Sequence, residues 1–189
     1  MKPTKTFNFP IFFLLFVAGI STAQELNVKS PNGKLELSIA LSDAIKWSAS
    51  LDNNVIIEHA TISMDMGNGR VLGNQPKLRR KRTDSKTENI VVQVPNKDAN
   101  IKSQYNQLQL DFRGNYQLIF RAYDDGVAYR FIDNASKTKA VFQEQMALTF
   151  PEGTLSYFPQ EESFYSHNER DYIHKRISEM KTGEFCSLP

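Results

Sequence analysis

The sequence has little cysteine and tryptophan, with one residue of each, and almost no excess of charge of either sign. A lone cysteine, Cys186, excludes an internal disulfide framework and a paired-cysteine zinc motif. Because its neighbours include Phe185 and Leu188, we expect Cys186 to be a small buried hydrophobic residue. The sequence also lacks a glycine-rich phosphate loop and a serine-centred nucleophile elbow, which points away from phosphate-loop nucleotide binding and serine-nucleophile catalysis.

Long hydrophobic runs are absent except near the N-terminus. Lys2 and Lys5 precede an apolar run at residues 12–20, and small residues follow up to Ala23. This order is typical of a secretory signal peptide, and the run is shorter than the roughly 20 residues of a membrane-spanning helix. We predict a signal peptide at residues 1–23, export of the protein, and no stable membrane anchor, because no cysteine follows the small residues for lipidation.

The charge balance argues against a nucleic-acid partner. The chain has 23 Lys and Arg against 21 Asp and Glu, and two of the basic residues, Lys2 and Lys5, belong to the predicted signal. The 166 residues from Gln24 onward therefore carry no formal net charge, so no nucleic-acid ligand is implied. A chain of about this length forms one ordinary domain that buries roughly two thirds of its unfolded surface.

Apolar residues alternate with polar ones along most of the chain, which is the pattern of strands with one buried face. Turn residues separate the alternating segments, and the Asp-Gly of residues 125–126 between two apolar runs indicates a hairpin. No segment after residue 23 shows the period of an amphipathic helix. We therefore predict an all-β fold, an antiparallel β-sandwich. Alternating apolar residues are found at Leu35, Leu37, Ile39, Leu41, Trp47, Ala49, Leu51, Ile62, Met64, Met66, Leu108, Leu110, Phe112, Tyr116, Leu118, Phe120, Met146, Leu148 and Phe150.

Two polar stretches fit this pattern less well. Residues 77–86 are strongly basic, with Arg79-Arg80-Lys81-Arg82 at their centre. They could form a patch for an anionic ligand, but a solvated loop or a charged edge strand that discourages sheet association is favoured, because no aromatic residues interleave the charges. Residues 95–103 are expected to form a loop.

Hydrolysis of a glycoside usually needs two carboxyl groups that flank the scissile bond. The adjacent pairs Asp124-Asp125 and Glu161-Glu162 do not suit this role, because neighbouring residues of a strand point to opposite faces. We interpret Asp124-Asp125 as part of the hairpin turn. In an extended conformation His167, Glu169 and Asp171 would share one face, which suits either a mixed metal site or the polar rim of a sheet.

Ordered sequence blocks resemble the N-terminal domain of the family 97 glycoside hydrolases. The blocks begin with Ser-Pro-Asn-Gly-Lys-Leu at residues 30–35 and Tyr-Asn-Gln-Leu at 105–108. Residues 120–131, with Arg-Ala-Tyr-Asp-Asp-Gly-Val-Ala-Tyr-Arg at their centre, resemble the hallmark hairpin of that domain. Glu144, and Glu169 followed by Tyr172, also resemble family positions.

The resemblance implies a large sandwich of the galactose-mutarotase type (a super-sandwich) that packs on a catalytic (β/α)₈ barrel beyond Pro189. It implies an exo-acting α-glycosidase of the periplasm, acting on α-linked glucosides or galactosides and dependent on calcium. Catalytic residues would lie on the barrel, and Glu169 would be this domain's metal ligand, one of the six to eight oxygen ligands that calcium prefers. Arg121 and Arg130 are expected to be structural, held by Asp124 or by backbone carbonyls.

Two other functions remain open from the sequence. One is a stand-alone carbohydrate-binding module that holds sugar without cleaving it. The other is a mutarotase-like epimerase, which would need a histidine acid and a carboxylate base in one cleft. His59, His167 and His174 show no such arrangement in the sequence, so the enzyme-domain hypothesis is favoured.

Overall fold

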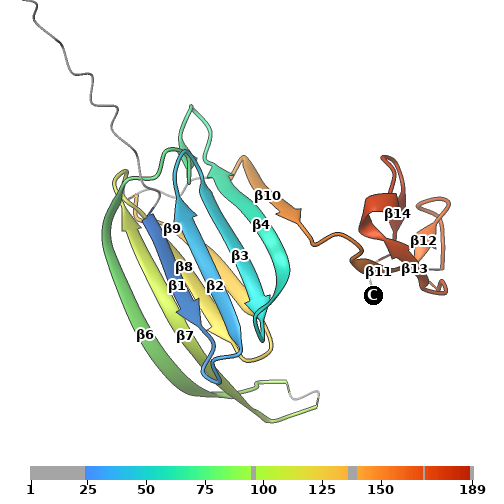
Figure 1. Ribbon diagram of the computed structural model, residues 1–189, viewed down its shortest axis with the longest axis horizontal. Helices are drawn as coiled ribbons and strands as arrows, with labels where there is room; N and C mark the ends of the chain where they lie inside the picture. Colours follow the sequence, from blue (N-terminus) through green and yellow to red (C-terminus); the bar gives the residue numbers. More distant parts are fainter. Residues whose placement is uncertain (1–23, 95–96, 136–139, 168, 188–189) are drawn as a thin grey trace, which may run out of the picture.

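The computed structural model describes residues 24–94, 97–135, 140–167 and 169–187. Two antiparallel sheets pack face to face over most of this length, and a smaller C-terminal segment lies to one side of them (Figure 1). The predicted signal peptide, residues 1–23, lies outside the described residues. No helix in the described ranges is long and apolar enough to cross a membrane.

The first sheet has six strands in the order β1-β2-β3-β4-β10, with the short β5 paired to β4. The second sheet has four strands in the order β6-β7-β8-β9. The first sheet comprises β1 (Gln24–Lys29), β2 (Leu35–Leu41), β3 (Ile45–Leu51), β4 (Asn54–Asp65), β5 (Val71–Leu72) and β10 (Gln143–Thr149). The second comprises β6 (Leu78–Val91), β7 (Asn100–Phe112), β8 (Tyr116–Tyr123) and β9 (Val127–Asp133).

The core lies between the two sheets and follows the alternation of the sequence. Leu37 and Ile39 of β2 face Leu118 and Phe120 of β8 across one hydrophobic cluster, and all four are 0–1% exposed. The all-β prediction is therefore confirmed. The core supplies most of the stability, because burial contributes about 25 cal/mol per Å² of apolar surface.

Two sequence blocks that lie 92 residues apart meet at one end of the sandwich. The carboxylate of Asp124, in the β8–β9 turn, accepts a hydrogen bond from the backbone N–H of Asn32 at 2.9 Å. Ser30, which is 2% exposed, closes the same β1–β2 turn through its hydroxyl and the N–H of Leu35. The turn interpretation of Asp124 is thus confirmed, and this side chain also ties the two sheets together.

Of three further sequence expectations, the structure confirms one and corrects two. The basic stretch lies on β6, an edge strand of the second sheet, as favoured above. The loop predicted at residues 95–103 is wrong at its end: β7 begins at Asn100 and continues a long hairpin with β6. Cys186 is exposed rather than buried, because it lies in a two-residue strand, β14 (Phe185–Cys186), that no further layer covers in the described part of the chain.

The C-terminal segment consists of two small two-stranded ladders. β11 (Leu155–Phe158) pairs with β13 (Ile173–Arg176), and β12 (Gln160–Glu161) pairs with β14. A single 3₁₀ turn, η1 (Ile177–Glu179), follows β13. Such short ladders bury little apolar surface, so this segment depends on polar contacts or on further partners for its stability.

Candidate functional site

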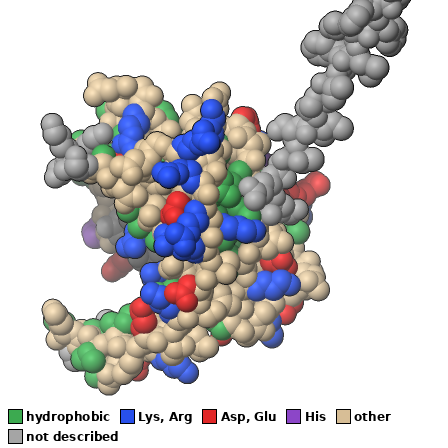
Figure 2. All heavy atoms as spheres, turned by 90° about the vertical axis from the view of Figure 1, so that its left-hand side faces the viewer, with side chains coloured by type: hydrophobic (Ala, Val, Ile, Leu, Met, Phe, Trp, Pro, Cys, Tyr) green, Lys and Arg blue, Asp and Glu red, His purple; other side chains and the backbone are tan. Residues whose placement is uncertain are grey.

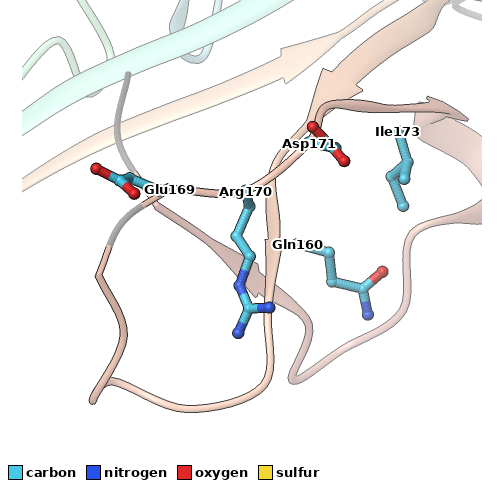
Figure 3. Close-up of a pocket in the computed structure, with 5 residues that line it drawn as sticks. All are labelled: Gln160, Glu169, Arg170, Asp171 and Ile173. Carbon is cyan, nitrogen blue, oxygen red and sulfur yellow. The ribbon is translucent and has the colours of Figure 1, made fainter.

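A cavity of about 560 Å³ opens in the C-terminal segment (Figure 3). Its walls come from β12, from the connection that leads to β13, and from the start of β13. Lining side chains are Gln160, Glu169, Arg170, Asp171 and Ile173. Residues 169–172 precede β13 and belong to no strand, and Glu169 and Asp171 line the cavity whereas His167 is not among its lining side chains.

An ion pair between the exposed Arg170 and the buried Glu161 fixes one wall of this cavity. The Nε of Arg170 lies 3.0 Å from Oε2 of Glu161, whose side chain is only 3% exposed. Burial on its own would raise the pKa of Glu161, but hydrogen bonds from Ser166 and Arg170 and the charge of Arg170 together lower it. Glu161 is therefore an anion at neutral pH, and its pairing holds the backbone next to Glu169.

The acidic lining offers oxygen atoms of the kind that calcium prefers as ligands, but fewer of them than calcium needs. Glu169, Asp171 and the amide of Gln160 offer hard oxygen donors. Figure 3 shows the carboxylates of Glu169 and Asp171 on opposite sides of Arg170, with Glu169 pointing away from the other labelled side chains. Among the described residues no group of three or more His, Cys, Asp or Glu gathers to hold a metal ion. The donors thus fit calcium in kind, and further ligands would have to join Glu169.

One buried polar atom near the cavity is left over. Oε1 of Glu161 has no hydrogen-bond partner within the described ranges, whereas Oε2 of the same carboxylate accepts a hydrogen bond from Arg170. Sequence reasoning missed this residue as a support of the site, having treated it only as half of an acidic pair. Its burial leaves no pattern in the sequence, since β12 is two residues long.

The histidines of the chain occupy separate places. Nε2 of His59, on β4, lies 3.0 Å from the hydroxyl of Thr149 on β10. His174, on β13, packs its ring edge-on against Tyr157 at 4.5 Å. These two histidines therefore lie on different sheets, and each contacts a side chain of the neighbouring strand.

Arg121 of the hallmark hairpin is held by side chains of its own sheet. Its guanidinium lies 4.2 Å above the ring of Tyr105, and its Nε donates to Gln107 at 3.0 Å. These contacts support the structural interpretation of Arg121, with a different partner from the Asp124 that the sequence suggested. Arg130 is exposed on the same sheet.

Glu144, the other family-like acid, is also tied to the hairpin. The hydroxyl of Tyr129 donates to Oε1 of Glu144 at 2.9 Å. Burial, followed by this hydrogen bond and the charge of Glu144, raises the pKa of Tyr129 to about 12. Tyr129 therefore stays protonated at physiological pH and joins β9 of the second sheet to β10 of the first.

The two packed antiparallel sheets define a β-sandwich domain, and the comparisons give its family. A sequence model of the family described as Glycosyl-hydrolase 97 N-terminal matches residues 28–189. A retaining alpha-galactosidase of Bacteroides thetaiotaomicron is 26% identical over 195 residues, covering 98% of this chain and 29% of that protein. The chain belongs to the glycosyl-hydrolase 97 N-terminal family.

Solved structures share the fold. A β-arabinopyranosidase aligns with a TM-score of 0.63 and 23% identity, over 79% of this chain and 26% of that one. A family 97 enzyme of Pseudoalteromonas sp. strain K8, in complex with panose, aligns with a TM-score of 0.54 and 16% identity, over 64% of this chain and 20% of that one. The same alignment values are found for a complex with acarbose. The chain thus spans less than a third of the length of each of these proteins.

Proposed function

We propose that the chain is the N-terminal domain of an exported, calcium-dependent, exo-acting α-glycosidase, in which it packs on a (β/α)₈ barrel and supplies Glu169 to the metal. The observation that carries the proposal is the 560 Å³ cavity, where an outward-pointing Glu169 lies next to the ion pair of Arg170 with the buried Glu161. A calcium ion at this place would supply a fixed positive charge beside the bound sugar. The side chains of Arg170 and Glu161 position the loop that presents Glu169.

Exposed aromatic residues of the same segment support a packing partner. Phe164 and Tyr165 are 91% and 97% exposed, and Tyr157 is 68% exposed. Phe164 also stacks on Phe185 at 4.7 Å, so this aromatic pair stands on the outside of the segment. Exposed apolar surface of this kind marks interaction sites, and the greater length of the relative supports the proposal that the partner belongs to the same polypeptide.

The relatives suggest the substrate class. One is named a retaining alpha-galactosidase, and another was solved with panose and with acarbose. We therefore propose an α-linked oligosaccharide as the substrate of the complete enzyme. Exposed aromatic residues would also suit a stand-alone module that stacks on sugar rings, so what favours the enzyme domain is that the chain covers 29% of its alpha-galactosidase relative.

The test replaces Glu169 in the complete enzyme. Glu169→Gln removes the charge while retaining the shape of the side chain, and we expect the calcium concentration for half-maximal activity to rise at least about tenfold. Hydrolysis of p-nitrophenyl α-galactoside and α-glucoside over a calcium titration measures this shift and tells the two specificities apart. The matched control is Glu152→Gln, an exposed glutamate in the turn after β10, which should leave the calcium response unchanged.

An unchanged calcium response in Glu169→Gln, with circular dichroism showing an intact sandwich, removes Glu169 from the metal site. The proposed export has its own measurement. Mass spectrometry of the periplasmic fraction should find a mature protein that begins at Gln24, and a cytoplasmic protein that retains residues 1–23 would contradict it.

A further inference from the structure

A second cavity lies on the sandwich itself, at the start of β6. Its volume is about 400 Å³, and Arg79, Arg80 and Gln117 are among the side chains that line it. Figure 2 shows Lys and Arg side chains gathered on the face that β6 borders, the left-hand side of Figure 1. The acidic cavity with Glu169 belongs instead to the C-terminal segment, beyond β10.

A β-bulge explains why two adjacent arginines line one cavity. In a regular strand Arg79 and Arg80 would point to opposite faces of the sheet. The pairing of β6 with β7 shifts register here, because Leu78 pairs with Phe112 and Arg80 already pairs with the next residue, Asp111. The extra residue, Arg79, bends the strand and redirects its side chain, a device that often occurs beside functional sites.

Two arginines and the carboxylate of Asp111 line this cavity, and the charge of the two arginines is not used within the described structure. The carboxylate of Asp111 is taken by Arg82, at 3.2 Å, and by the amide of Gln109, at 3.0 Å. Neither Arg79 nor Arg80 has a side-chain hydrogen bond or an ion pair among the described residues, and both are exposed. Two free guanidinium groups at one cavity suit a carboxylate or sulfate, which they can bind through paired hydrogen bonds.

The opposite wall offers neutral polar groups. Asn115 is fixed there, since its Nδ2 donates to the backbone oxygen of Asn134 at 3.0 Å and its backbone oxygen accepts from the N–H of Asn134 at 3.0 Å. The side-chain amides of Gln117 and Asn134 make no hydrogen bond within the part of the chain that the structure describes. Free amides beside a charged group are suited to the hydroxyls of a sugar that also carries an anionic group.

The floor of the cavity argues against a nucleic acid. Phe112 and Tyr116 lie there, but they are 2% and 6% exposed and stack on each other at 4.9 Å with an interplanar angle of 12°. No aromatic face is therefore open for stacking a base, which single-stranded nucleic-acid sites require. The free amides of the opposite wall also suit the hydroxyls of a saccharide unit, which a lone sulfate or phosphate lacks.

We propose that this cavity, named the Arg79–Arg80 cavity, binds an acidic saccharide, a sugar chain that carries carboxylate or sulfate groups. The site is separate from the Glu169 cavity and takes from the proposed function only that the ligand is a sugar. It would hold the protein on an anionic glycan while the complete enzyme acts elsewhere on neutral α-linked sugar.

The experiment is isothermal titration calorimetry of the full chain at low salt with tetragalacturonate, an α-linked carboxylated tetrasaccharide. The neutral maltotetraose, inorganic sulfate and a single-stranded tetranucleotide serve as comparison ligands. We expect binding of the carboxylated sugar that weakens with added salt, and at least about tenfold weaker binding of the other three.

The variant pair separates a built site from general attraction. Arg79→Gln with Arg80→Gln should weaken tetragalacturonate binding at least about tenfold. Lys97→Gln with Lys102→Gln removes the same charge at the exposed tip of the β6–β7 hairpin and should change the affinity less than twofold.

Equal losses in both double variants, no binding by the unaltered chain, or equal binding of the tetranucleotide or sulfate would each overturn the proposal. Circular dichroism and thermal melting confirm that both double variants fold. Loss of tetragalacturonate binding with intact calcium-dependent hydrolysis in the complete enzyme supports the second site. Failure of the Glu169→Gln test leaves this measurement untouched, so the two proposals fail separately.

Discussion

Gly73, just after β5, provides a sharp test of how the first sheet is packed. Its φ is +90°, and a Cβ built there would lie 2.9 Å from the backbone oxygen of Ile62 and 3.4 Å from Cα of Ser63. Both atoms belong to the backbone of β4, so neither can swing away. Gly33, in the β1–β2 turn, has a φ of +76° but nothing within 4 Å of the same Cβ. Both glycines have the left-handed conformation, but only at Gly73 would an added Cβ meet neighbouring atoms.

The expected loss of stability follows from two contributions. A side chain in the left-handed region costs about 1–2 kcal/mol, and alanine recovers about 0.4–1 kcal/mol by restricting the unfolded chain. Gly33→Ala should therefore lower the free energy of unfolding by about 1 kcal/mol or less. Gly73→Ala adds a clash with fixed backbone, for which overpacking costs of about 1–3 kcal/mol are typical, so its loss should be about 2–4 kcal/mol.

Urea unfolding of the full chain, followed by the fluorescence of the buried Trp47 and by circular dichroism, measures both losses. A difference of about 2 kcal/mol between the variants corresponds to about 4–8 °C in melting temperature for a domain of this size. Equal losses for Gly73→Ala and Gly33→Ala would refute the close approach of Gly73 to β4. They would show that the strain of the left-handed backbone accounts for the whole effect.

Two further predictions concern the core and the C-terminal segment. Leu118→Ala, at a fully buried position, should cost about 2–5 kcal/mol in urea unfolding, whereas Leu155→Ala, at a position that is 57% exposed, should cost about 0.5 kcal/mol or less. A similar loss for both would contradict the assignment of the core. The lowered pKa of Glu161 stabilises its segment above the unfolded carboxyl pKa of about 4.5, and this stability is lost as the pH falls through the folded value. Hydrogen exchange, corrected for intrinsic rates, should therefore become faster at residues 160–161 and 185–186 when the pH is lowered. The same residues should exchange faster at pH 7 in Arg170→Ala. Unchanged protection in that variant would show that the ion pair does not stabilise the segment.

The sandwich could be predicted from the sequence where one face of a strand is buried. The buried residues of β2 alternate with partly exposed ones because every second residue packs against the opposite sheet, and β8 does the same except at Ile119, which is also buried. The β6–β7 hairpin could not be traced in this way. Ile101 and Lys102 are exposed like most of β6, so no alternation marks these residues, and they are held in the strand by backbone pairing with β6.

The candidate site was predicted less completely, because the residues that support it follow no periodic pattern in the sequence. Glu169 was found through its resemblance to a family position, and the structure places it on a cavity. Glu161 and Gln160 were not, since the two-residue β12 is too short to show a periodicity. The error at Cys186 has the same origin: apolar neighbours indicate burial only where a second layer covers the strand.

The two cavities differ in what holds them, and this difference predicts which one works in the isolated chain. The Arg79–Arg80 cavity is framed by long strands over the main core, where Phe112 and Tyr116 are buried. The Glu169 cavity is framed by short ladders with exposed aromatic residues around them. A rigid frame preserves a binding geometry without a partner, whereas a weak frame needs packing from outside. Anionic sugar should therefore bind to the isolated chain, and the proposed calcium dependence should emerge only when the proposed barrel is present.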